Sequence, residues 1–279
     1  MVSSQPDMLT AQVQTVRALG PNMIRIVLGE GDLAQYVPIG VPDEAVALWF
    51  RGADPAAEPI GRNYSVRAFD PARAAMTIDF VVHDGGVAAE WAKQATPGDQ
   101  VEMSRPRSWY RPSPDARWHL LVADLAGLPA LARILEERDP AVPAHVIVEV
   151  PDERDLAMLP AAPGVTVQAC TGTGNGIAPS VLSAQVRARP LPPGPGYAWF
   201  AGEAGEARQV RKFLRTDHGW GRERLDAVGY WRVDSERWIA AYERVQDEMV
   251  AVYQGALDAG SSEKEASELY DDALEQAGL

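Results

Sequence analysis

The sequence predicts a two-domain chain: a six-stranded antiparallel β-barrel, then a doubly wound parallel sheet, with a helical extension at the C-terminus. Short alternating or β-branched segments separated by turn signals fill residues 9–107. Continuous apolar segments then alternate with helical ones, which is typical of a parallel sheet covered on both faces. We expect domains over residues 1–112, 113–233 and 234–279, a division that the length of 279 residues accommodates.

The expected barrel strands share alternation or β-branched side chains, and turn signals such as Pro42-Asp43 and Asp70-Pro71 separate them. In chain order they are AQVQTVRAL, NMIRIVLG, AVALWF, NYSVRAF, MTIDFVVH and QVEMSRP. One helix, VAAEWAKQA, interrupts this series. The Pro- and Arg-rich linker SWYRPSPDAR then leads into the second domain.

The second domain alternates buried strands with helices. Its expected strands are WHLLVAD, AHVIVEV, VTVQAC and GYAWFAG. The helix PALARILEER has Pro129 near its first turn, where a missing amide hydrogen does no harm. A second helix is expected over EARQVRKFLRTDHG. The glycine-rich segment TGTGNG follows a strand but opens no helical pattern, so we interpret it as a loop.

A long helical segment is expected after GYWR, residues 229–232, and it should end at Gly260-Ser261. Its apolar stripe consists of Trp238, Tyr242, Val245, Met249 and Val252. Such a stripe docks on its own domain, forms a dimer contact or covers a cleft as a lid. A further helix should start at Ser262, with Glu265 completing a capping box.

Composition limits the function classes. The net charge of −13 argues against nucleic acid or an anionic membrane as a partner. The N-terminus has neither a charged nor an apolar signal region, and no apolar run is long enough for a membrane span. A lone cysteine, Cys170, excludes an internal Cys-ligated cluster, and the histidines show no metal-ligand spacing. We therefore expect a cytoplasmic protein without a bound metal, as a monomer or weak dimer.

The segment GRNYSVRAFD, residues 61–70, is the first candidate site. Arg62 and Tyr64 lie two positions apart on a strand, so their side chains share a face. A tyrosine ring can stack on a flavin while a guanidinium pairs with a pyrophosphate, and the Ser65 hydroxyl could bond the flavin edge. The alternative is a solvated strand face with a cross-strand ion pair, and the residues alone leave both open.

Two further segments carry glycines where strands meet helices. HDGGVAAEWA places Gly85-Gly86 before a helix, whose free amides are suited to phosphate. WFAGEAGEARQVRKFL places a Gly-Glu-Ala turn at the carboxyl edge of the sheet, where open α/β sheets bind ligands. Neither segment is specific by itself.

Taken in order, these segments resemble the siderophore-interacting protein family of FAD-dependent ferric-siderophore reductases. The matching motifs are RNYSVR, H-x-G-G-x-A-A-x-W-A, P-G-D, the Asp–LPA–helix segment, AGEA-x-x-x-R-x-x-R and GYWR, and they cover roughly residues 9–233. The resemblance implies a flavin-binding barrel and a nicotinamide-binding sheet domain. It also implies reduction of a ferric siderophore by NADH or NADPH through FAD, which releases Fe(II).

The resemblance assigns site residues by position, and it implies no catalytic side chain, because electrons pass through the flavin. Cofactor-binding residues would be Arg62, Tyr64, Ser65, Val82, His83, Gly86, Val87, Ala88, Ala89, Asp124, Gly202, Glu203, Ala204 and Trp231. Arginines attracting the anionic siderophore would be Arg51, Arg107, Arg111 and Arg232. The chain has Ala89 where the family usually has serine, so a hydroxyl to the phosphate is lost.

Alternatives remain at this stage. The chain could be a general flavin or ferric reductase, the reductase partner of an oxygenase, or a degenerate member that only binds a ferric chelate or a partner protein. The choice between nicotinamides is also open. Arg154 follows the strand AHVIVEV where a 2′-phosphate could bind, but the neighbouring acids oppose a phosphate and favour NADH. These acids are Glu149, Asp152, Glu153 and Asp155.

Overall fold

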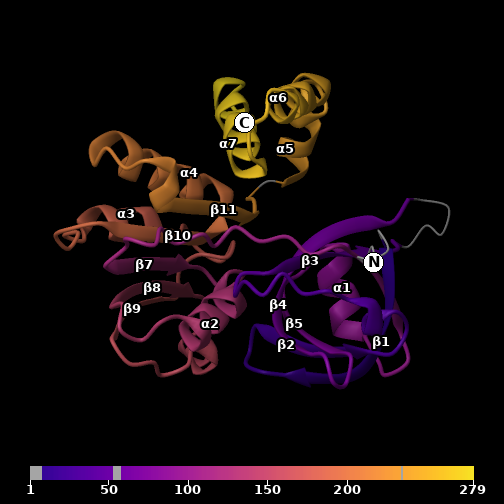
Figure 1. Ribbon diagram of the computed structural model, residues 1–279. Coiled ribbons are helices and arrows are strands. Elements are labelled where there is room, and N and C mark those ends of the chain that lie inside the picture. The colour runs from indigo at the N-terminus through magenta and orange to yellow at the C-terminus, as the bar shows by residue number, and fades with distance from the viewer. Residues whose placement is uncertain (1–7, 53–57, 234) are drawn as a thin grey trace. The chain divides into compact units, whose positions relative to one another are not determined.

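The computed structural model describes residues 8–52, 58–233 and 235–279 (Figure 1). The chain divides into two compact units, Met1–Tyr230 and Trp231–Leu279. The first unit holds the barrel and the parallel sheet, and the second is helical. None of the described helices combines the length and the apolar character that crossing a bilayer requires.

The predicted six-stranded barrel is confirmed. It closes in the order β1-β2-β5-β4-β3-β6, with antiparallel neighbours. The strands are β1 (Met8–Ala18), β2 (Met23–Gly29), β3 (Ala45–Phe50), β4 (Ile60–Asp70), β5 (Ala75–Val81) and β6 (Gln100–Ser104). Alternate side chains point inward, as Leu9, Ala11 and Val13 do on β1, and they fill the barrel core. The helix α1 (Val87–Gln94) packs against this core through Ala88 and Ala92.

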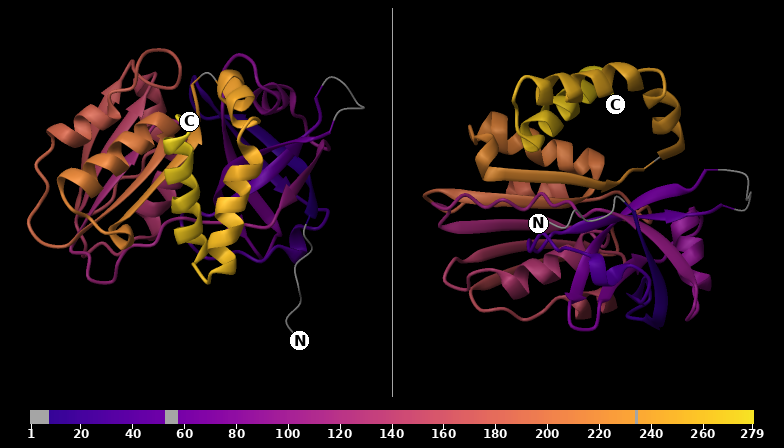
Figure 2. Two further views of the ribbon diagram at one scale, coloured as in Figure 1. Left: turned by 90° about the horizontal axis from the view of Figure 1, so that it is seen from above. Right: turned by 45° about the vertical axis from the view of Figure 1, so that its right-hand side comes forward.

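The second half of the first unit is a five-stranded sheet in the order β11-β10-β7-β8-β9 (Figure 2). Its strands are β7 (Trp118–Ala123), β8 (Ala144–Val150), β9 (Val165–Thr171), β10 (Gly196–Glu203) and β11 (Leu225–Trp231). The pairs β10–β7, β7–β8 and β8–β9 are parallel. The strand order reverses between β7 and β10, the position where open α/β sheets bind ligands.

Helices cover both faces of the sheet, as predicted. The helix α2 (Leu128–Glu137) packs on one face against residues such as Leu121, Val146 and Trp199. The helices α3 (Leu182–Ala188) and α4 (Ala204–Lys212) pack on the other, against Leu120 and Phe200 among others. Neighbouring residues of one strand thus point to opposite cores, which explains why these strands are apolar throughout.

Several local features differ from the sequence prediction. The strand β11 and the short helix α3 were not among the predicted elements, and α4 begins at Ala204 rather than Glu206. The earlier start follows from Glu203, whose carboxylate accepts a hydrogen bond from the Glu206 amide and caps the helix. The chain then ends α4 in a π-helical turn, Phe213–Asp217. The TGTGNG segment is a loop between β9 and α3, as predicted.

The second unit contains α5 (Ser235–Tyr242), α6 (Gln246–Asp258) and α7 (Glu263–Gln276). The prediction of one long helix up to Gly260 is wrong, because Val245 adopts φ −123° and separates α5 from α6. The apolar stripe survives the break: Tyr242, Val245 and Met249 still join one cluster with residues of α7. The predicted capping box of Ser262 and Glu265 is confirmed at the start of α7.

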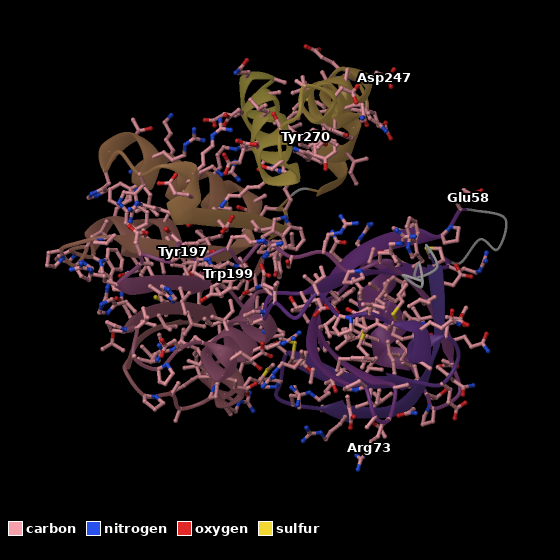
Figure 3. All side chains as sticks on the ribbon, in the orientation of Figure 1. Glu58, Arg73, Tyr197, Trp199, Asp247 and Tyr270 are labelled. Atoms are coloured by element: carbon pink, nitrogen blue, oxygen red, sulfur yellow. The ribbon has the colours of Figure 1, made fainter. Side chains whose placement is uncertain are left out.

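A buried acid joins the two halves of the first unit. Asp43, in the loop before β3, is fully buried and accepts hydrogen bonds from the amides of Trp109 and Tyr110 in the linker, at 3.0 and 2.7 Å. The indole of Trp199 on β10 donates to the same carboxylate at 3.3 Å. Figure 3 shows Trp199 beside Tyr197 inside the sheet domain. Burial raises the pKa of Asp43 to about 6 despite these donors.

The helix α2 supplies a second connection to the barrel. Arg133 is buried and donates to the carbonyl of Val66 on β4 at 2.9 Å. Arg67, the next residue of β4, forms a bidentate ion pair with Glu136 at 2.5 and 2.7 Å. These contacts fix the strand that carries the first candidate site against the sheet domain.

Gly127 lies where α2 begins, at the reversal of strand order. A Cβ added there would lie 2.9 Å from the Cβ of Ala201 and would overlap the Ala201 carbonyl oxygen. The obstacle is mainly the backbone of β10, which cannot rotate away as a flexible side chain would. Only glycine therefore allows α2 to approach β10 this closely.

We predict a pH-dependent stability difference between Asp43→Asn and the wild-type protein. Because the folded pKa of Asp43 lies above its unfolded value, its contribution is fully present below pH 4 and is lost as pH rises through 6. Between pH 5 and pH 8 the wild type should lose about 1–2 kcal/mol relative to the variant. Urea unfolding across this range measures the difference, and Asp84→Asn, at an exposed carboxylate, is the control. A constant difference would contradict the prediction.

We also predict that Gly127→Ala lowers the free energy of unfolding by about 2–3 kcal/mol, since the methyl group overpacks the α2–β10 contact. Gly52→Ala is the matched control. A Cβ at Gly52 meets nothing within 4 Å, so that variant should stay within about 0.5 kcal/mol of the wild type. Urea midpoints compare the variants, and equal midpoints for both would show that the helix start can shift.

Candidate functional site

The first candidate site lies along β4, where Arg62 and Tyr64 share a face as predicted. The Arg62 side chain is exposed, and its guanidinium donates to the carbonyl of Gly61 at 2.9 Å. Among the described residues no carboxylate pairs with it. The Tyr64 ring packs on the barrel core, with its centroid 4.4 Å from that of Phe80 and 6.2 Å from that of Phe50. Burial raises the pKa of the Tyr64 hydroxyl, which keeps it protonated at physiological pH.

The start of α1 follows directly from the strand that pairs with β4. After β5, Val82 is anchored by its amide, which donates to the Asn22 carbonyl at 2.8 Å, and His83 is exposed beside Gly86. A Cβ at Gly86 would lie 3.3 Å from the His83 ring. Gly86 has φ +86°, a conformation that favours glycine, and it N-caps α1.

The chemistry of this end of the barrel fits the diphosphate of a dinucleotide. No side chain caps α1, so the amides of its first turn, Val87, Ala88 and Ala89, keep their capacity to donate to an anion. The exposed guanidinium of Arg62 adds a positive charge without a competing carboxylate in the described chain. Backbone amides thus offer hydrogen-bond donors to a phosphate at the position where Ala89 offers no hydroxyl.

Ser65 points away from Tyr64 and contacts the sheet domain. Its side chain is buried, and its hydroxyl donates to the Tyr230 hydroxyl at 3.4 Å. The Tyr230 ring also lies 6.4 Å, centroid to centroid, from that of Trp109. Sequence reasoning missed Tyr230, although GYWR contains it, because nothing local shows that its hydroxyl reaches β4.

Asp124 and Gly202 meet at the reversal of strand order. Asp124 follows β7 and is buried, and its Oδ1 accepts hydrogen bonds from the amides of Ala126 and Gly127 at 2.8 and 3.2 Å. A Cβ at Gly202 would lie 2.8 Å from the Oδ2 of Asp124. The two predicted residues are therefore neighbours, and the carboxylate is already bound to the start of α2.

Glu203 and Ala204 form the turn from β10 into α4. The Glu203 side chain caps α4 through the amide of Glu206, at 3.0 Å. Ala204 packs against Gly229 of β11, where a Cβ would lie 2.7 Å from that of Ala204. This explains the glycine of the GYWR motif: it lets β11 pass close to the start of α4.

The arginines proposed for the siderophore occupy different parts of the chain. Arg51 and Arg107 are exposed, at the end of β3 and at a bridge between residue 107 and Ala45. Arg111 is exposed too, and its guanidinium donates to the Ser108 hydroxyl at 2.8 Å.

Trp231 and Arg232 belong to the second unit of the chain. There the Arg232 guanidinium lies 4.5 Å from the centre of the Trp238 ring, which itself stacks on Tyr242 at 4.9 Å. Stacking of this kind holds a guanidinium in a defined orientation.

Comparison with known proteins supports the resemblance across both halves of the first unit. The family described as "Siderophore-interacting FAD-binding domain" matches residues 49–110, and the family described as "Siderophore-interacting protein" matches residues 116–234. Among solved structures, a siderophore utilization protein from T. fusca superposes with a TM-score of 0.73 at 30% identity. The superposition covers 83% of this chain and 95% of that one.

Two curated relatives carry named activities. The ferric vibriobactin reductase ViuB of Vibrio cholerae is 28% identical over 232 residues, which cover 76% of this chain and 84% of that protein. The NADPH-dependent ferric-chelate reductase of Escherichia coli is 29% identical over 201 residues, with 71% and 74% covered. Together with the match to the T. fusca structure, these findings show that the chain belongs to the siderophore-interacting protein family.

Proposed function

We propose that this protein is an FAD-dependent reductase that takes electrons from NADH or NADPH and reduces a ferric siderophore, so that iron leaves as Fe(II). The named relatives are reductases of ferric vibriobactin and of ferric chelates, and the barrel matches an FAD-binding domain. The observation that carries the proposal is the combination of two features of the barrel. Arg62 has no carboxylate partner among the described residues, and the start of α1 has no side-chain cap.

The residues of this chain would bind the flavin cofactor and orient its ring. FAD, when bound, would supply the redox chemistry that matches a two-electron donor to a one-electron acceptor. Arg62 and the α1 amides would hold its diphosphate, while Tyr64 and Ser65 would contact its ring. Val82 and His83 would border the same group. A general base is not required, because the electron transfer itself moves no proton from the substrate.

The sheet domain would bind the nicotinamide. Gly202, Glu203 and Ala204 lie at the carboxyl edge of β10, where strand order reverses and a flat ring can approach between the strand ends. Asp124 stands on the other side of this reversal, and Trp231, the last residue of β11, would be a further cofactor-binding residue. Tyr230 links this edge to Ser65, so the flavin ring and the nicotinamide would meet near its hydroxyl.

The substrate is an anionic iron complex, and reduction is the step that releases its metal. Fe(III) is held by hard oxygen ligands, and Fe(II) is held less tightly by the same ligands. Arg51, Arg107, Arg111 and Arg232 would attract the complex by charge. We place this reaction in the cytoplasm and expect a monomer or weak dimer, with no nucleic-acid partner.

We predict that Arg62→Ala weakens FAD binding at least about tenfold, because a charge-assisted hydrogen bond to phosphate is lost. Arg73→Ala, on the β4–β5 turn, is the matched control and should bind FAD as the wild type does (Figure 3). Titration of the apoprotein with FAD, followed by flavin absorbance, measures both. A wild-type protein that cannot be loaded with FAD would refute the proposed function.

We predict that Arg232→Ala lowers the affinity for a ferric siderophore about tenfold while the bound-flavin spectrum stays unchanged. Arg244→Ala, at an exposed arginine of the same unit, controls for the loss of one positive charge. Fluorescence-quenching titrations with the ferric complexes of a catecholate and a hydroxamate siderophore provide the measurement. Unchanged affinity for both complexes would remove Arg232 from the substrate site.

A further inference from the structure

The carboxyl edge of the parallel sheet is lined by carboxylates that occupy the starts of its own helices. Asp124 accepts from two amides at the start of α2, at 2.8 and 3.2 Å. Glu203 accepts from the amide of Glu206 at the start of α4, at 3.0 Å. The carboxylate of Glu206 in turn accepts from the Ser183 amide in the first turn of α3, at 2.6 Å. These amides are the donors that a phosphate would otherwise use.

The connection after β8 shows the same arrangement. It contains a short 3-10 helix, Glu153–Met158, and Asp152 caps it by accepting from the amide of Arg154 at 2.9 Å. Carboxylates thus accept from amides just before α2, in the first turns of α3 and α4, and at the start of this short helix. At the start of α1 in the barrel, by contrast, no side chain caps the helix and Arg62 adds a positive charge to that end of the barrel.

Glu149 adds a buried acid at the end of β8. Its Oε1 accepts from the Thr173 hydroxyl at 2.9 Å and from the Val181 amide at 2.7 Å, which holds the TGTGNG loop over the strand. Its Oε2 is buried and has no hydrogen-bond partner in the described chain. Gly174, with φ +74°, packs against this oxygen so closely that any Cβ would overlap it.

The acids at the end of β8 bear on which nicotinamide dinucleotide the sheet domain would bind. In doubly wound sheets an acid near the end of the second strand favours the free 2′-hydroxyl of a dinucleotide's adenosine, whereas an arginine there accommodates a 2′-phosphate. In the order β11-β10-β7-β8-β9, β8 is the second strand of the domain. Glu149 is enclosed beneath the loop, so Asp152, just beyond the end of the strand and partly exposed, is the acid at this position.

Arg154 is the basic residue at this position, and it is already paired. Its guanidinium donates to Asp152 at 2.9 and 2.6 Å. Hydrogen bonds from Arg154 lower the pKa of Asp152 to about 2, so the carboxylate stays charged at physiological pH. A 2′-phosphate could pair with Arg154 only by displacing the Asp152 carboxylate. That carboxylate would then remain, negatively charged, beside the negatively charged phosphate.

We propose that this edge selects NADH and discriminates against NADPH. The inference rests on the proposed function, and it names the donor that the function leaves open. NADPH brings an additional phosphate to an edge where carboxylates lie at or beside the helix starts and where Arg154 is paired with Asp152. The preference is therefore opposite to the donor in the name of the Escherichia coli relative.

Isothermal titration of the FAD-loaded full chain with NAD⁺ and NADP⁺ tests the proposal without relying on turnover. NAD⁺ should bind at least about tenfold more tightly, and 5′-AMP should likewise bind more tightly than 2′,5′-ADP. Because the discrimination is electrostatic, the ratio of the dissociation constants for NADP⁺ and NAD⁺ should become smaller when salt is raised from about 0.05 M to about 0.5 M. Equal or tighter binding of NADP⁺ would overturn the proposal.

The variant Asp152→Asn examines the role of the pair. Asparagine keeps an oxygen that can cap Arg154 but removes the charge, so NADP⁺ should bind about threefold more tightly while NAD⁺ is unchanged. Adding Arg154→Gln should abolish this gain. Glu153→Gln removes one exposed negative charge next to the Asp152–Arg154 ion pair. It therefore controls for a nonspecific change in the local electrostatic potential. An equal gain with Glu153→Gln would contradict the assignment to Asp152 and Arg154.

The experiment separates this inference from the proposed function. If neither nucleotide binds, the inference fails. Dithionite-reduced protein that still reduces a ferric siderophore, detected with a ferrous trap, would keep the proposed function intact in that case. If the dithionite-reduced protein is inactive while NAD⁺ binds selectively, the reductase function fails and the nucleotide preference stands.

Discussion

The arrangement of the first unit depends on one buried carboxylate. Asp43 comes from the barrel, its amide partners Trp109 and Tyr110 lie in the linker, and its indole partner Trp199 belongs to β10. A buried acid without these donors would be strongly destabilising, so the three segments must come together for the chain to fold around it. This constraint brings the middle of β4, which carries Ser65, close to the carboxyl edge of the sheet.

The two edges that meet there have opposite electrostatic character. The barrel side offers Arg62 and the uncapped amides of α1, which are suited to anions. On the sheet side, the carboxylate of Asp124 accepts from amides just before α2, and that of Glu203 caps α4. If the proposed function holds, the diphosphate of FAD would fit the first edge, and a nicotinamide donor with few charges would fit the second.

Local sequence patterns predicted much of this fold. The features that they did not predict depend mostly on contacts between residues far apart in the sequence. The barrel strands, the parallel sheet and the Ser262 capping box follow from periodicity and turn residues within a few positions of each other. The break at Val245 does not, because the apolar stripe continues through it. Asp43 was only part of a turn signal in the sequence, since its partners lie far along the chain. Tyr230 was missed for the same reason.

Tyr230 shows what these long-range contacts add to the chemistry. Burial, followed by the nearby carboxylates of Asp43 and Asp124, raises the pKa of its hydroxyl, while the hydrogen bond from Ser65 opposes this effect only in part. The group is therefore a neutral phenol at physiological pH. The contact between β4 and the sheet edge is thus made by two neutral hydroxyls, those of Ser65 and Tyr230, although the sheet edge beside it is acidic.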